Sequence, residues 1–141
     1  FIVLGADKDV ECKLDNVIIL PRITDQIILS EYYSMADVLL LTSKRETFSM
    51  VAAESLACGT PVVGFDSGAP KEVAPDGYGI FVPYGDLNAL YDALKGVKDN
   101  SIELNSSLDC EDFAKNRYSV EDMSHQYEEI YKKLLKKYEN K

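Results

Sequence analysis

The sequence has no tryptophan, one histidine and three cysteines in 141 residues. The cysteines are far apart and form no C-x-x-C pair, which argues against a disulfide framework or a zinc site and predicts free thiols in a reducing, cytoplasmic compartment. No Ser-His-Asp or Cys-His set can be assembled, and no group of His, Cys and Asp has metal-ligand spacing. A G-x-G-x-x-G dinucleotide-binding fingerprint is also absent. We therefore expect neither a metal nor a bound cofactor.

Positive charge is scarce, because 15 Lys and Arg face 24 Asp and Glu and give a net charge of −9. This balance argues against nucleic acid as a partner. The exception is the stretch 132–141, whose five Lys and one Glu carry +4 and leave −13 for the rest of the chain. Lysines near the end of a helix are favoured by the helix dipole, and peripheral contact with an anionic membrane surface is the alternative. No apolar run approaches the roughly 18 residues of a membrane-spanning helix.

Short apolar runs alternate with longer amphipathic stretches along the chain. Strands are predicted at 1–5, 17–20, 38–41, 61–65 and 79–82, and residues 6–16 as a charged loop or a poor helix. Helices are predicted after the caps Thr24-Asp25, Asp86 and Ser119, from Phe48 or Ser49 to Ala57, and through Phe113. This alternation favours an α/β fold with a parallel sheet between helix layers.

The last predicted helix carries an apolar stripe at helical spacing, formed by Met123, Tyr127, Ile130, Leu134 and Tyr138. The single histidine, His125, lies off this stripe. We therefore expect His125 to be solvated and not catalytic.

The most informative stretch runs from Ser43 to Glu72 and contains two carboxylates, Glu46 and Glu54, eight residues apart. A buried strand should end just before it, and a helix should begin between the two glutamates. The end of a strand followed by a helix N-terminus is where open α/β sheets bind phosphates. A carboxylate on the helix would suit the two hydroxyls of a ribose, since it only accepts hydrogen bonds. From spacing alone, surface charge is the simpler explanation for both glutamates, because two Glu on a helix-like segment are common.

Three segments of this stretch, E-T-F-S-M-V-A-A-E, S-L-A-C-G-T-P-V-V and S-G-A-P-K-E, follow the lead-in Ala36-Asp37-Val38 and Thr42-Ser43. Together they resemble the retaining glycosyltransferases of the GT-B fold, a family marked by Glu-x7-Glu. The resemblance covers roughly residues 1–135. It implies a three-layer α/β/α, Rossmann-like parallel sheet, the C-terminal nucleotide-sugar-binding half of such an enzyme. Because the chain opens within a strand, we expect the first strand and helix of this half, with a diphosphate-gripping basic pair, to lie outside it.

The resemblance also implies roles for individual residues. Glu46 would approach the donor sugar and act in catalysis, and Glu54 would hold the ribose. The donor would further contact Thr47, the backbone amides of Phe48, Ser49, Met50 and Val51, backbone groups around Arg22, and the chain near Gly5. The family often has Gly where this chain has Thr47, and Gly-Gly where this chain has Gly68-Ala69. Glu72, which follows the second of these departures, is therefore a weaker site candidate.

The implied reaction transfers a sugar from a nucleotide-diphosphate sugar with retention and without a metal. A uridine nucleotide is expected on family frequency, and a guanosine nucleotide is the runner-up. The acceptor, a saccharide or a lipid-linked sugar, would bind an N-terminal domain outside this chain, in the synthesis of bacterial surface or capsular polysaccharide or glycolipid. Alone, the chain is expected to be inactive. The alternatives are a sugar-nucleotide epimerase or phosphorylase of the same architecture and a non-catalytic α/β interaction or receiver-like module. Asp37 and Asp66 do not form the acidic cluster that a receiver needs.

Overall fold

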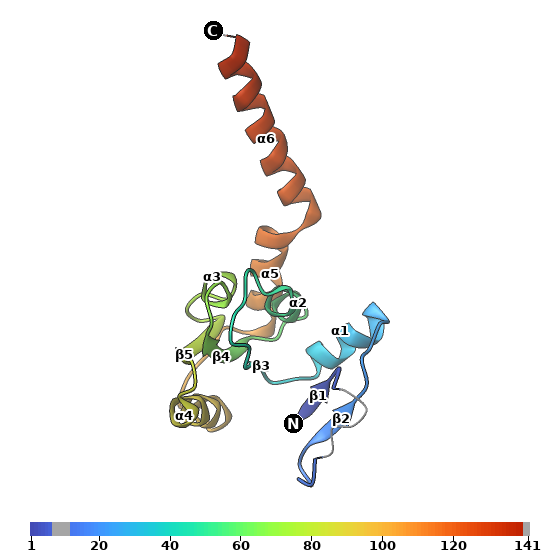
Figure 1. The fold of residues 1–141 in the computed structure, drawn as a ribbon, viewed down its shortest axis with the longest axis vertical. Helices are drawn as coiled ribbons and strands as arrows, with labels where there is room; N and C mark the ends of the chain where they lie inside the picture. Colours follow the sequence, from blue (N-terminus) through green and yellow to red (C-terminus); the bar gives the residue numbers. More distant parts are fainter. Residues whose placement is uncertain (7–11, 140–141) are drawn as a thin grey trace.

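The computed structural model describes residues 1–6 and 12–139, so much of the loop predicted at 6–16 lies outside the described residues. Within them, strands and helices alternate from residue 18 to residue 98, as the sequence predicts, and two further helices follow (Figure 1). In chain order they are β1 (Ile2–Leu4), β2 (Ile18–Leu20), α1 (Gln26–Ser34), β3 (Leu39–Leu41), α2 (Met50–Ala57), β4 (Val62–Asp66), α3 (Pro70–Val73), β5 (Gly79–Pro83), α4 (Leu87–Lys98), α5 (Ser107–Tyr118) and α6 (Val120–Glu139).

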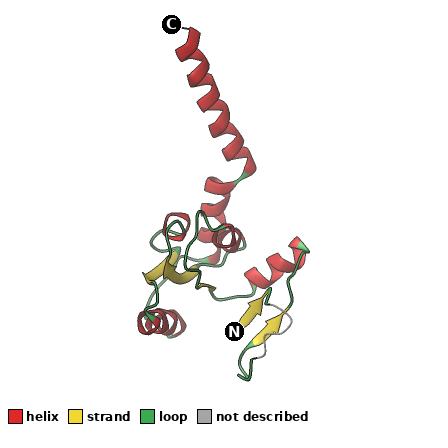
Figure 2. Ribbon diagram, in the orientation of Figure 1, coloured by secondary structure: helices red, strands yellow, loops and turns green. Residues whose placement is uncertain are grey.

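Every strand pairing in the described residues is parallel, which confirms the predicted α/β fold. The strands form two sheets instead of one: β1 pairs with β2, and β4 lies between β3 and β5 (Figure 2). No backbone ladder joins the two sheets within the described residues. In Figure 1, β1 lies on the side of its sheet that is nearer to β3, so the free edges of β1 and β3 are turned toward the same gap.

Two fully buried residues of β4 divide the core into two faces. Val62 packs in a cluster with Leu56 of α2 and Cys110 of α5, whereas Val63 packs in a second cluster with Leu90 of α4. Successive side chains of a strand point to opposite faces of the sheet, so these clusters are its two sides. Helices α2, α3 and α5 therefore cover one face and α4 the other, which is the predicted three-layer arrangement.

Side-chain caps begin most of the longer helices. The Asp25 carboxylate accepts from two backbone N–H groups of α1, and the Asp86 carboxylate accepts from one of α4. Ser106 begins α5 with a capping box, and Ser119 caps α6 through the N–H of Asp122. The predicted caps at Asp25, Asp86 and Ser119 are confirmed, and each satisfies a backbone donor that a helix end would otherwise leave unpaired.

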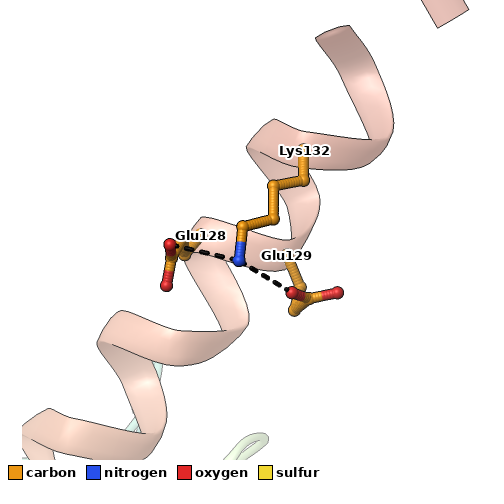
Figure 3. Close-up of polar contacts among 3 residues, drawn as sticks. All are labelled: Glu128, Glu129 and Lys132. Carbon is orange, nitrogen blue, oxygen red and sulfur yellow. Dashed lines mark hydrogen bonds and ion pairs between the residues drawn. The ribbon is translucent and has the colours of Figure 1, made fainter. Parts of the chain in front are cut away.

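Helix α6 extends away from the rest of the protein (Figure 1). Its large apolar side chains are exposed; they are Val120, Met123, Tyr127, Ile130, Tyr131, Leu134, Leu135 and Tyr138. The predicted stripe is present, and His125 is exposed as expected. On the polar side, the Lys132 ammonium lies 3.1 Å from Glu128 and 3.3 Å from Glu129 (Figure 3). Among the described helices, none is both long and apolar enough to cross a membrane.

Gly64 permits the close spacing of β3 and β4. It pairs with Leu41, and a Cβ at this position would overlap the Leu41 carbonyl oxygen. We expect Gly64→Ala to lower the free energy of unfolding by about 1–3 kcal/mol, because the strands must separate to admit a methyl group. Denaturant unfolding measures the loss. Gly85→Asn is the control, since Gly85 has open space around it and asparagine tolerates its φ of +86°. Equal losses of unfolding free energy in both variants would show that the loss does not come from the close spacing of β3 and β4.

Candidate functional site

The loop that follows β3 is fastened to the loop that follows β4. The backbone N–H of Glu46 donates to the Ser67 carbonyl over 3.0 Å, and Glu46 forms a parallel bridge with Gly68. A Cβ on Gly68, whose φ is +109°, would come within 3.1 Å of the Glu46 carbonyl oxygen. The two loops therefore meet where the strands end, and this contact holds Glu46, which is half-buried, at that edge of the sheet.

Helix α2 begins beside this contact with an unusual backbone. Its N-cap, Ser49, has φ +75° and ψ +74°, a left-handed conformation that costs a residue with a Cβ roughly 1–2 kcal/mol. Ser49 is only 4% exposed, and its hydroxyl has no hydrogen-bond partner in the described residues. Because Ser49 makes no side-chain cap, the positive end of the helix dipole remains available to an anion. Strained residues of this kind are concentrated at functional sites.

Glu54 is the half-buried carboxylate of α2 and is bonded to a residue of α1. One of its oxygens, Oε2, accepts from the Tyr33 hydroxyl over 3.1 Å. Burial, and then the Glu54 carboxylate, raise the pKa of Tyr33, so the hydroxyl stays protonated and donates. Tyr33 was not among the predicted site residues, because a contact across 21 residues leaves no local signal in the sequence.

The structure brings most of the predicted donor-binding residues into one segment. The loop after β3 and the first five residues of α2 carry Glu46, Thr47, Phe48, Ser49, Met50, Val51 and Glu54. The Phe48 ring is turned toward α5, with its centroid 5.7 Å from that of Tyr118 in an edge-on arrangement. The side chains of Thr47, Met50 and Val51 are exposed.

Gly5 and Arg22 lie elsewhere, after the ends of β1 and β2. The Gly5 N–H donates to the Leu20 carbonyl, which pairs the two strand ends, and both Gly5 and Arg22 are exposed. Among the described residues neither makes a hydrogen bond to the segment 46–54. Glu72 is exposed in the first turn of α3. The donor roles predicted for Gly5 and Arg22, and the weaker one for Glu72, remain predictions.

An open hollow of about 1430 Å³ lies between α2, α5 and the start of α6. Glu54 lines it together with Met50, Phe113 and Tyr118, whereas Glu46 does not. The two glutamates therefore face different surroundings, although they belong to one segment. Within residues 1–6 and 12–139, no three His, Cys, Asp or Glu side chains are grouped closely enough to hold a metal ion.

The chain is similar to a protein family and to several characterised proteins. A family model described as Glycosyl transferases group 1 matches residues 1–100. An N-acetyl-alpha-D-glucosaminyl L-malate synthase of Bacillus anthracis is 31% identical over 110 residues, which is 77% of this chain and 29% of that protein. A GDP-mannose-dependent alpha-mannosyltransferase of Mycobacterium tuberculosis is 37% identical over 60 residues, 42% of this chain and 16% of that protein.

Among solved structures, sucrose-phosphate synthase from Thermosynechococcus elongatus superposes with a TM-score of 0.72 at 30% identity. The match covers 86% of this chain and 31% of the synthase. The chain thus spans less than a third of the length of these relatives.

The left-handed backbone and the buried, unpaired hydroxyl of Ser49 should both lower the stability of the protein. We expect Ser49→Gly to raise the free energy of unfolding by about 1 kcal/mol or more, because glycine adopts a φ of +75° without strain and no hydroxyl is then buried unpaired. Ser49→Ala is the matched control, since it removes the hydroxyl but keeps the Cβ and therefore the strain. Thermal unfolding ranks the three proteins. If the alanine variant is as stable as the glycine variant, the left-handed backbone is not the source of the cost.

Proposed function

Because the chain belongs to the family of group 1 glycosyltransferases, we propose that it is the donor-binding part of an enzyme that transfers a sugar from a nucleotide-diphosphate sugar. The observation that carries this proposal is the segment 46–54, where two glutamates flank an uncapped helix N-terminus at the edge of a parallel sheet. Relatives named as a glucosaminyl malate synthase and as a GDP-mannose-dependent mannosyltransferase support it.

In this proposal Glu54 holds the ribose of the donor. A carboxylate offers about four lone-pair positions, and Tyr33 uses one of them. Those that remain can accept from the 2′- and 3′-hydroxyls of a ribose. The diphosphate lies at the N-terminus of α2, where amide groups and the helix dipole favour an anion and the side chain of the N-cap Ser49 does not bond to them. This arrangement needs no metal and no further cofactor.

Glu46 is proposed to act on the donor sugar. As the bond between the anomeric carbon and the diphosphate oxygen breaks, negative charge grows on the diphosphate and positive charge on the sugar ring. The amides of α2 stabilise the first, and the Glu46 carboxylate stabilises the second. The acceptor oxygen bonds to the anomeric carbon on the face that the diphosphate leaves, and its proton departs with the diphosphate. The configuration of the sugar is therefore retained.

The two sheets support the proposal that this chain is part of a larger nucleotide-binding half. A doubly wound sheet has the strand order 3-2-1-4-5-6. The orders β2-β1 and β3-β4-β5 reproduce it if strand 1, which would pair with both β1 and β3, comes from outside the chain. Strand 1 and its helix would also carry the basic pair expected for the diphosphate, and a further domain would bind a saccharide or lipid-linked acceptor. A role in surface polysaccharide or glycolipid synthesis is part of this proposal.

The binding role of Glu54 can be tested with nucleoside diphosphates. We expect Glu54→Gln to weaken the binding of uridine diphosphate to the full-length protein by about 1–3 kcal/mol, the scale for a hydrogen bond to a charged group. Titration calorimetry measures the change, with guanosine diphosphate as the second ligand. Glu31→Gln is the matched control, because Glu31 is exposed on α1. Undiminished affinity in Glu54→Gln would remove the ribose role.

The same titration, combined with a measurement of the sugar-transfer rate, distinguishes the role of Glu46 from that of Glu54. Glu46→Gln should leave nucleoside diphosphate affinity within about twofold of the unchanged protein, because Glu46 is assigned to the sugar, but it should lower the rate of sugar transfer. A product with inverted configuration would contradict the proposed mechanism. An epimerase or phosphorylase, the alternatives of the same architecture, would instead convert the nucleotide sugar without an acceptor or consume inorganic phosphate.

Peripheral membrane contact is a second proposal, and α6 is the element assigned to it. The helix exposes an apolar stripe, and its last two turns are rich in lysine. Such a helix can lie on an anionic lipid surface with its apolar side buried among the headgroups.

Vesicle sedimentation tests this assignment. We expect the full-length protein to bind phosphatidylglycerol vesicles more than phosphatidylcholine vesicles, and Lys133→Glu/Lys137→Glu to reduce that binding at least several-fold. Lys71→Glu/Lys98→Glu, which changes the charge equally on α3 and α4, is the control. No binding to anionic vesicles, or equal losses in both double variants, would show that α6 does not make the contact.

A further inference from the structure

The hydrogen bond between Tyr33 and Glu54 is the one side-chain contact that fixes either glutamate of the segment 46–54 in the described residues. It joins two helices, α1 and α2, and is partly buried. Tyr33 belongs to none of the sequence segments that carry the resemblance, and the donor-binding role proposed above does not require it.

We propose that Tyr33 is a positioning residue, whose hydroxyl holds Oε2 of Glu54 so that the carboxylate presents its remaining lone pairs to the ribose. This inference rests on the proposed donor role of Glu54. In the absence of the bond, a glutamate on a helix surface would choose among several side-chain rotamers, and binding would have to restrict them at a cost in free energy.

The main chain of Tyr33 is itself fixed by the turn that follows α2. The hydroxyl of Thr60, which is only 2% exposed, donates to the Tyr33 carbonyl over 2.6 Å. The Ser55 hydroxyl donates to the Thr60 carbonyl over 2.8 Å, and the Thr60 N–H donates to the Ser55 carbonyl over 2.9 Å. Ser55 is the residue next to Glu54 on α2. The contacts therefore close a ring that runs from Glu54 through α2 to Thr60, across to Tyr33 and back to Glu54.

The closed ring makes the Tyr33 hydroxyl a fixed donor. Burial and the neighbouring carboxylate keep that hydroxyl protonated, so it donates to the carboxylate over the physiological pH range. Since a tyrosine hydroxyl has one proton to give, it engages one lone pair of Glu54 and leaves the others free. The bond selects an orientation of the carboxylate and does not compete with the ligand for it.

The test uses Tyr33→Phe in the full-length enzyme, because phenylalanine keeps the ring and its packing and removes the hydroxyl alone. We expect affinity for uridine diphosphate to fall about tenfold, with less than a twofold change for the 2′,3′-dideoxy analogue, which has no ribose hydroxyl to present to Glu54. Tyr32→Phe, the same change at the neighbouring position of α1, is the matched control and should leave both affinities unchanged. Thermal unfolding of each variant reports the effect on folding separately.

A double-mutant cycle with Glu54→Gln separates this inference from the proposed function. If Tyr33 acts through Glu54, adding Tyr33→Phe to Glu54→Gln should cost less than twofold in uridine diphosphate affinity. Unchanged affinity in Tyr33→Phe, together with a loss in Glu54→Gln, would overturn the positioning role and leave the proposed function standing. Equal losses for both nucleotides in Tyr33→Phe would show a structural role only and would also overturn it. Full affinity in Glu54→Gln would overturn the ribose role and the positioning role together.

Discussion

The parallel pairing of β3 with β4 is the constraint on which the site depends. Parallel strands end at the same edge of a sheet, so the loops that follow them meet there, and the bond from Glu46 to Ser67 fastens one to the other. Gly64 allows the strands their close approach, and the small side chains of Ala52 and Ala53 let α2 pack directly on them. The direction of α2, and with it the spacing of the two glutamates, follows from this packing.

The same packing explains why Ser49 is held in a costly conformation. The chain must turn sharply from the loop into α2, and the residue at the turn is buried, so the surrounding contacts fix its backbone. A serine elsewhere at an N-cap would offset the helix dipole with its own hydroxyl. Here the left-handed backbone prevents that cap and leaves the helix N-terminus available for a ligand. The conformation of Ser49 thus lowers the stability of the fold, and it leaves unpaired the backbone N–H groups that the proposed function needs.

Local signals made much of the fold predictable. Apolar runs marked the strands, and Asp25, Asp86 and Ser119 marked helix starts, because capping is decided within three or four residues. The division into two sheets was not predictable in this way, since it depends on pairing between strands far apart in sequence. The contact of Tyr33 with Glu54 likewise arises only when α1 packs beside α2.

The two glutamates differ in how the fold holds them, and this difference fits their proposed tasks. Glu54 is fixed through its carboxylate by a side chain from another helix. Glu46 is held through its backbone, by the bond to Ser67 and the bridge to Gly68, and its carboxylate makes no hydrogen bond within the described residues. A group that binds ribose gains from a preset orientation, because every donor presents the same two hydroxyls. A group that stabilises charge developing on a sugar acts from a set distance, and the backbone anchor of Glu46 provides that distance.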